Sequence, residues 1–116
     1  GQGAILDTQA RVVDSSAPAA VGEIVAVYAT GLGATNPTVP SGQGAPTDPL
    51  AKVTIPVEAT VDGKAAVVHF AGLAPTYVGL YQVNVQIPDG VSRGSAVPLV
   101  LYQSGVPSNT VTLAIR

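Results

Sequence analysis

Histidine, serine and carboxylate side chains are the groups of this chain that could support acid–base or nucleophilic chemistry. The single histidine, His69, lies on an outward position of a predicted strand beside Phe70. A catalytic histidine needs an orienting group and a nucleophile within hydrogen-bonding reach, and the sequence predicts neither beside it. The serines occupy turn or linker segments, where serine bonds to the local backbone, and none lies in a Gly-x-Ser-x-Gly elbow. We therefore expect a surface or cross-strand packing role for His69 and no enzymatic activity.

The carboxylates are too scattered to predict a metal site. The seven acidic residues never alternate with Asn or Asp as the ligands of a calcium loop do. Asp62 and Asp89 each precede a glycine in a predicted turn, which accounts for both. One alternative stays open, in which Asp14 or Glu23 meets another carboxylate across a loop and binds Ca²⁺. The chain has no cysteine, which excludes disulfides and thiolate ligands, and we expect no cofactor.

The aromatic residues are few, and two of them suggest contact with a partner. The chain has four Tyr, one Phe and no Trp. Tyr28 and Tyr102 fall on outward strand positions, which suit either a protein interface, where tyrosine is enriched, or an ordinary half-buried site. Both interpretations stay open. The sequence shows no platform of Trp or clustered Tyr of the kind that binds carbohydrate.

Charge and hydropathy restrict the classes of partner. Charged residues make up 10% of the 116 residues and the net charge is −2, whereas about a quarter of an average protein is charged. Without a basic stripe, nucleic acid binding is not expected. No apolar run approaches the roughly 20 residues of a membrane helix, so membrane insertion is not expected either. With so few charged residues, either the chain is unusually well folded with a surface of Ala, Gly and Thr, or part of its surface is buried against a partner.

Alternation of apolar and polar residues predicts strands along the whole chain. The clearest case is residues 79–87, where Gln82, Asn84 and Gln86 alternate with apolar side chains. Residues 23–30 are apolar on both faces, which indicates a strand covered on both sides. Residues 71–78 are predicted to turn, and no helical period is found. Further strands are predicted over 55–61, 65–70, 97–102 and 110–115, with a hairpin turn at Asp62–Gly63.

Three side chains refine this prediction. In the strand over 65–70, Phe70 is expected to point into the core, opposite to its outward neighbour His69. Pro98 falls on an outward position of its strand, which an edge strand tolerates because proline lacks the ladder N–H. Tyr81 lies where immunoglobulin-like folds place their corner tyrosine. These spacings predict an all-β, immunoglobulin-like sandwich of about seven to nine antiparallel strands, formed by residues 1–116 as one domain.

The N-terminal segment and a long loop are the places where we expect contact with other molecules. Residues 1–13 are predicted to form a strand or hairpin that adds to the open edge of a neighbour, and residues 14–22 a linker. Residues 31–48 are rich in Gly and Pro, and loops of this length are usually functional or disordered. The candidate partner contacts are Ala4, Ile5, Leu6, Ile24, Tyr28 and Tyr102, and the candidate loop-binding residues are Asn36 and Tyr77.

Several segments together resemble known domains. GEIVAVYATGL at 22–32, VDGKAAVV at 61–68 and LYQVNVQIP at 80–88 are similar to the IPT/TIG branch of immunoglobulin-like domains. GQGAIL, YATGLGATNP, FAGLAPTYVGLYQVNVQIP and GVPSNTVTLAI resemble an uncharacterised C-terminal domain of large secreted acidobacterial proteins, over essentially the whole chain. This resemblance implies an exported protein, extracellular or at the cell surface. The family has no established activity that could be transferred to this chain. The chain has no methionine, so we expect a processed chain or an excised domain.

The first functional hypothesis is a non-catalytic structural or assembly module that binds protein, including copies of itself. Deleting residues 1–13 would then abolish assembly and leave the sandwich folded. The alternative is an adhesion module that binds carbohydrate or protein through the 31–48 loop.

Overall fold

The computed structural model describes residues 5–6, 13, 18–29, 32–33, 35–36, 39, 42, 44, 51–74, 80–107 and 111–116. These residues form strands, turns and irregular segments and include no helix, so the predicted all-β class is confirmed. The described residues include ten strands, four of which have only two residues. The strands are β1 (Ile5–Leu6), β2 (Ile24–Ala29), β3 (Thr35–Asn36), β4 (Lys52–Val53), β5 (Val57–Val61), β6 (Lys64–Leu73), β7 (Tyr81–Gln86), β8 (Gly94–Gln103), β9 (Val106–Pro107) and β10 (Val111–Ile115).

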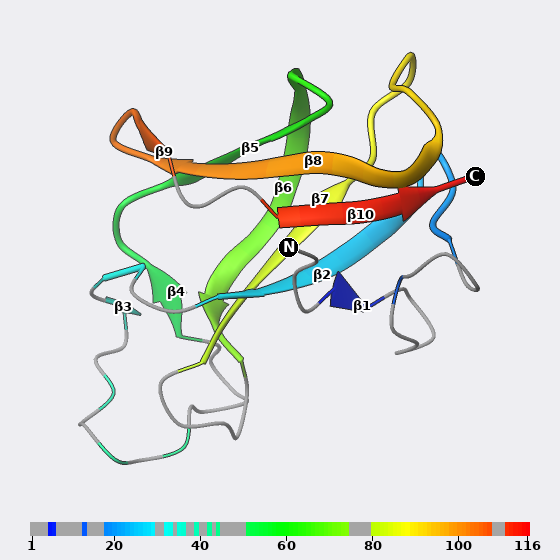
Figure 1. Ribbon diagram of the computed structural model, residues 1–116. Coiled ribbons are helices and arrows are strands. Elements are labelled where there is room, and N and C mark those ends of the chain that lie inside the picture. The colour runs from blue at the N-terminus through cyan, green and yellow to red at the C-terminus, as the bar shows by residue number, and fades with distance from the viewer. Residues whose placement is uncertain are drawn as a thin grey trace.

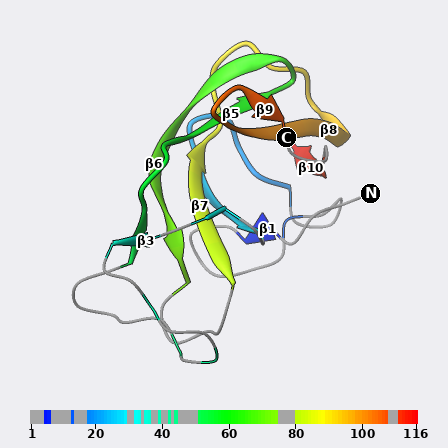
Figure 2. The ribbon, with the colours of Figure 1, turned by 90° about the vertical axis from the view of Figure 1, so that its left-hand side faces the viewer.

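The strands form one curled antiparallel sheet in the order β1-β2-β7-β6-β5-β8-β10, with β3, β4 and β9 attached at its margins. The sheet folds over so that β1, β2 and β7 lie in one layer and β5, β8 and β10 in the other (Figure 1). β6 belongs to both layers, because residues 64–66 pair with β5 and residues 67–73 pair with β7. Figure 2 shows β6 sweeping from one layer into the other. This arrangement is compatible with the predicted immunoglobulin-like sandwich.

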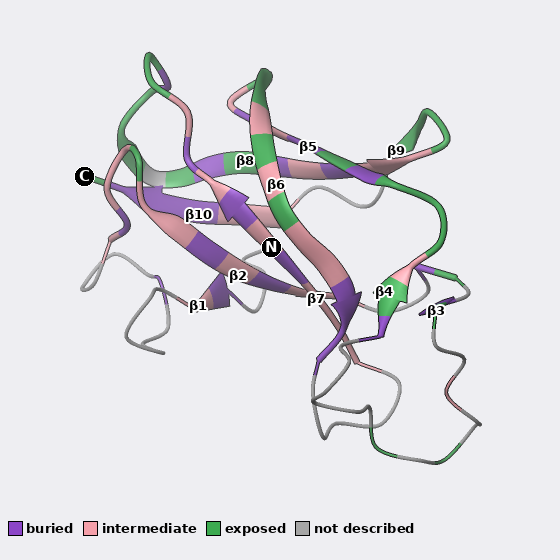
Figure 3. Cartoon of the chain, turned by 180° about the vertical axis from the view of Figure 1, so that it is seen from behind, coloured by how far each residue is buried: buried purple, intermediate pink, exposed green. Residues whose placement is uncertain are grey.

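The core lies between the two layers and is built from alternate residues of each strand. Buried and more exposed residues follow one another along β2, β7 and β8 (Figure 3), as expected for strands with one face on the core. The largest fully buried side chains are Ile5, Ile87, Leu99, Leu113, Val13, Val25, Val61, Val83 and Val85. Aliphatic and β-branched residues therefore fill the core without any aromatic ring among these buried side chains.

The prediction that Pro98 belongs to an edge strand is wrong, because its strand β8 lies between β5 and β10. Pro98 is opposite Thr112 of β10, and its carbonyl accepts the N–H of Asp62 at 2.9 Å. The N–H and C=O of a strand residue point to the same side, so the missing N–H of Pro98 faces β5. β5 ends at Val61 and turns away there, which is why a central strand accommodates this proline.

A β-bulge in β6 overturns the predicted inward position of Phe70. Val68 is opposite the buried Val85, but Phe70 is opposite Asn84, and the register shifts between them. The extra residue, His69, reverses the alternation, as bulges do. His69 and Phe70 therefore both lie on the outer face of the sheet. β6 also continues through Leu73, although residues 71–78 were expected to turn.

Two polar side chains tie the loops to the strands. The Tyr81 hydroxyl donates to the carbonyl of Gly33, 48 residues upstream. A corner tyrosine bonds to the backbone only a few residues upstream. Tyr81 is therefore not a corner tyrosine, and its hydroxyl instead links β7 to the segment after β2. The Gln103 amide donates to the carbonyls of Leu32 at 2.7 Å and Ile55 at 3.0 Å. This amide therefore joins two segments far apart in the sequence.

The described N-terminal residues Ile5, Val13 and Ala19 are buried in the sandwich. β1 pairs with β2, and the N–H of Val13 donates to the carbonyl of Ile5 at 2.9 Å. Ala19, within the predicted linker, is buried and pairs in parallel with Ile115 of β10. Because Ile5 and Val13 are both fully buried, the expectation that the domain stays intact without residues 1–13 is revised. Their removal would open the core.

The hairpin turn predicted at Asp62–Gly63 is confirmed, since both residues have positive φ, at 53° and 74°. The backbone N–H of Ser92 donates to Asp62 Oδ2 at 2.8 Å. This hydrogen bond, together with one from the Ser92 side chain and the charge of Lys64, lowers the pKa of Asp62 from its ordinary value of 3.8.

The substitution Asp62→Asn is expected to destabilise the protein at pH 7 but not in acid. Asparagine tolerates the same left-handed backbone, so the turn is kept while the charge is lost. A carboxylate with a lowered pKa stabilises the fold above its unfolded value, and this stabilisation is lost as pH falls through the folded value. The urea midpoints of the two proteins should therefore differ at pH 7 and converge below about pH 4. A difference independent of pH would contradict this role for the ionised carboxylate.

Candidate interaction surfaces

His69, the residue most suited to acid–base chemistry, is part of a hydrogen-bonded pair on the outer face of the sheet. Its Nε2 lies 3.0 Å from Gln86 Oε1, and Gln86 Nε2 donates to the carbonyl of Gly22 at 3.2 Å. The bond to Gly22 orients the amide with its oxygen toward His69, so His69 Nε2 carries the hydrogen. The cross-strand contact matches the predicted packing role of this histidine.

The carboxylates of the described residues do not gather into a metal site. No group of three or more His, Cys, Asp or Glu side chains that could hold an ion occurs in this part of the chain. Glu23, one of the two residues considered for Ca²⁺, accepts the backbone N–H of Ala20 at 2.9 Å and so stabilises the turn before β2. The other, Asp14, lies outside the described residues.

The outer face of β2, β7 and β6 carries amides flanked by aromatic rings. Tyr28 of β2 is opposite Gln82, and Asn84 is opposite Phe70 of β6. Each of these side chains is partly exposed. We call this surface the amide face and define it by Tyr28, His69, Phe70, Gln82, Asn84 and Gln86.

Hydrogen bonds order the amides on this face. Gln82 Nε2 donates to Asn84 Oδ1 at 2.9 Å, which uses the NH₂ of Gln82 and the oxygen of Asn84 and does not engage the oxygen of Gln82 or the NH₂ of Asn84. Within the described part of the chain, neither of these groups has a protein partner. The face therefore presents both an acceptor and a donor that are held in place by their neighbours.

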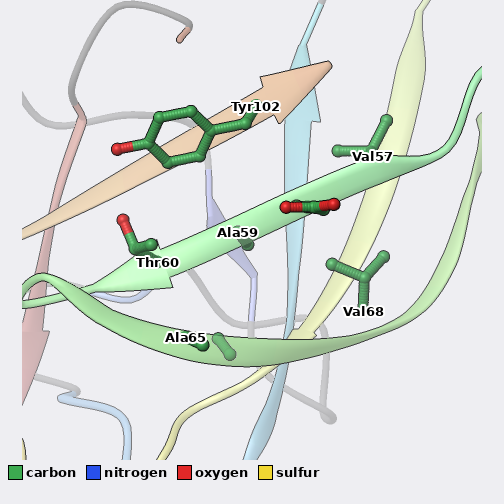
Figure 4. Close-up of a pocket in the computed structure, with 8 residues that line it drawn as sticks. Val57, Ala59, Thr60, Ala65, Val68 and Tyr102 are labelled. Carbon is green, nitrogen blue, oxygen red and sulfur yellow. The ribbon is translucent and has the colours of Figure 1, made fainter. Parts of the chain in front are cut away.

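A second surface is a shallow depression of about 560 Å³ where β5 and β6 diverge. β5 and β6 pair only from Ala59 to Val61, so Val57 has no partner residue on β6. Figure 4 shows Tyr102 and Thr60 at one end of the depression and Val57 and Val68 at the other. The lining residues are Val57, Glu58, Ala59, Thr60, Ala65, Ala66, Val68 and Tyr102.

The residues predicted to contact a partner lie on different surfaces and differ in burial. Ile24 and Tyr28 lie on the outer face of β2 and are half-buried, and Leu6 is beside them on β1. Ile5, in contrast, is fully buried in the core of its own chain. In this arrangement its side chain offers no surface to a partner. Tyr102 lines the depression between β5 and β6.

Of the two candidate loop-binding residues, the structure describes Asn36 but not Tyr77. Asn36 is exposed on β3, where it pairs with Lys52 of β4. Lys52 is in turn opposite Gly72, and Gly72 is opposite Gln82 of the amide face. Asn36 therefore belongs to the same row of the sheet as Tyr28, at its far end. Ala4, Tyr77 and most of residues 31–48 lie outside the described residues.

Comparison with protein-family models, with curated proteins and with solved structures finds no match for this chain. The residues that the structure describes include no apolar helix of membrane-spanning length.

Proposed function

We propose that this chain is a non-catalytic structural module of an exported bacterial protein, and that its copies assemble by exchanging strand β1. The observation that carries the proposal is the position of Ile5. This side chain is 0% exposed, yet it belongs to a two-residue strand at the outermost position of its layer. Because this edge strand is so short, the same strand of another copy could take its place and insert its own Ile5 into the core.

The bonds of β1 would be the same in an exchanged assembly. β1 contacts the domain by pairing with Val27 and Ala26 of β2 and through the bond from Val13 to Ile5. A strand from a neighbouring copy would make the identical pairs, which is why exchange of an element is a low-cost route to assembly. The low charge of the chain adds support, because few like charges oppose the approach of copies. The exported location is supported by the resemblance to secreted acidobacterial domains.

The test is a disulfide between β1 and β2 in the full chain, which has no cysteine of its own. Leu6 is opposite Ala26, and paired residues on adjacent strands lie within disulfide range. After oxidation, the double variant Leu6→Cys/Ala26→Cys is expected to give covalent dimers and larger species on a non-reducing gel. Crosslinked monomers alone would show that β1 remains in its own chain and would overturn the proposal.

The matched control joins two strands that the proposal does not exchange. Ala26 is also opposite Asn84 of β7, so Ala26→Cys/Asn84→Cys should close within one chain under the same oxidation. Dimers from this second pair would mean that random collisions, rather than strand exchange, produce the crosslinks.

A further inference from the structure

The bulge in β6 creates an arrangement on the amide face that regular alternation would not. It brings His69 and Phe70, two ring side chains adjacent in sequence, to the same face. A Cβ built on Gly72 would lie 2.8 Å from Phe70 Cζ, so the phenyl ring extends along the strand over this glycine. Gly72 and Tyr28 flank Gln82 on opposite sides. The amides of β7 are therefore bordered by an aromatic ring on each side.

We propose that the amide face is a binding site for a neutral oligosaccharide. Sugar hydroxyls both donate and accept hydrogen bonds, and an amide side chain offers both a donor and an acceptor without charge. The bond between Gln82 and Asn84 does not engage the oxygen of Gln82 or the NH₂ of Asn84, which are the acceptor and the donor offered to a sugar. Tyr28 and Phe70 supply apolar ring surface for the C–H face of a sugar.

The charge of the surface favours a neutral ligand. None of the six residues that define the amide face is an acid, a lysine or an arginine. Among the described residues, Lys52 follows Gly72 in the same row of the sheet and lines a depression with His69 and Phe70, so this end of the face carries a cation. The two amides at the centre, Gln82 and Asn84, carry no charge that would pair with an anionic sugar.

The size of the amide face favours a small ligand over a folded partner. Gln82 and Gln86 are four residues apart on one strand, which corresponds to about 14 Å, and three strands span about 10 Å. The resulting area of about 140 Å² is far below the ~800 Å² that each partner buries in a stable protein interface. A short oligosaccharide matches the amide face, whereas a second protein would need surface beyond it.

The experiment is electrophoresis of the full chain through native gels that contain one polysaccharide each. Four neutral polymers serve as probes, namely hydroxyethyl cellulose, xylan, galactomannan and amylopectin, with polygalacturonate as the anionic comparison. Retardation by at least one neutral polymer is expected, and Phe70→Ala or Asn84→Ala should weaken it about three- to tenfold. Circular dichroism checks that each variant is folded.

Two control variants separate the amide face from other surfaces. Val106→Ala changes a side chain that is 68% exposed on β9, and Tyr102→Ala changes the depression between β5 and β6. Neither should alter the retardation. The proposal is overturned if no neutral polymer retards the protein, if polygalacturonate binds more tightly, or if the amide-face variants bind normally. It is also overturned if Phe70→Ala changes the mass in solution by light scattering, because the face would then bind protein. This last result would leave the disulfide test of strand exchange unaffected.

Discussion

Gly72→Ala is expected to detach β4 from β6 and to destabilise the domain by about 1–3 kcal/mol. A Cβ at this position would lie 2.3 Å from the carbonyl oxygen of Ala51 and 3.0 Å from the Cα of Lys52. Both are backbone atoms, so no rotation of a side chain relieves the overlap. The same carbonyl accepts the N–H of Leu73 at 2.9 Å, and moving it away breaks this bond.

Hydrogen exchange gives a local readout of this effect. The Leu73 amide should be protected in the wild type and exchange faster in Gly72→Ala, because its acceptor has moved. Gly105→Ala is the control, since a Cβ there meets nothing within 4 Å and its cost comes from a φ of 76° alone. That variant should leave the Leu73 amide protected. Equal exchange of Leu73 in all three proteins would contradict the close approach of β4 to β6.

Ile5→Ala is expected to destabilise the full chain by about 2–5 kcal/mol, the range for truncating a buried isoleucine. For a domain of this size the melting temperature should fall by roughly 8–20 °C. The side chain is fully buried among core residues that include Val27, its neighbour on β2. Although Ile5 belongs to the outermost strand of its layer, its loss would leave a cavity inside the sandwich.

Ile55→Ala is the matched control for this prediction. Ile55 is 46% exposed, so the same chemical change there should stay within about 0.5 kcal/mol. Thermal unfolding of both variants, followed by circular dichroism, makes the comparison. Similar melting temperatures for the two variants would mean that β1 is not seated in the core.

The sequence predicts the fold well where a strand keeps one face buried throughout. In β7 the amides alternate with buried valines without interruption, and the predicted strand over 79–87 contains the observed 81–86. The prediction fails within β6, because a bulge leaves no mark in the pattern of apolar residues. Strands of two residues, such as β3 and β9, are too short to show any period.

The candidate site was predictable only in pieces. Tyr28 was placed outward by its own strand, and Gln82 and Asn84 by theirs, but their alignment depends on the register between β2 and β7. Register between strands distant in sequence is set by tertiary packing, which alternation within one strand does not report. The alternation of residues 65–70 predicts Phe70 in the core, so the sequence does not reveal the second ring that borders the amides.

The sharing of β6 between the two layers also has a consequence for the order of folding. β5, β6 and β7 are consecutive in the chain and pair in that order, whereas β2 reaches β7 and β5 reaches β8 only by closing long loops. Pairings with less loop to close form sooner, so this meander is expected to lead. Because this meander already contains strands of both layers, the sandwich would begin to fold as a bent unit, and β2 and β8 would then join its two edges as their long loops close.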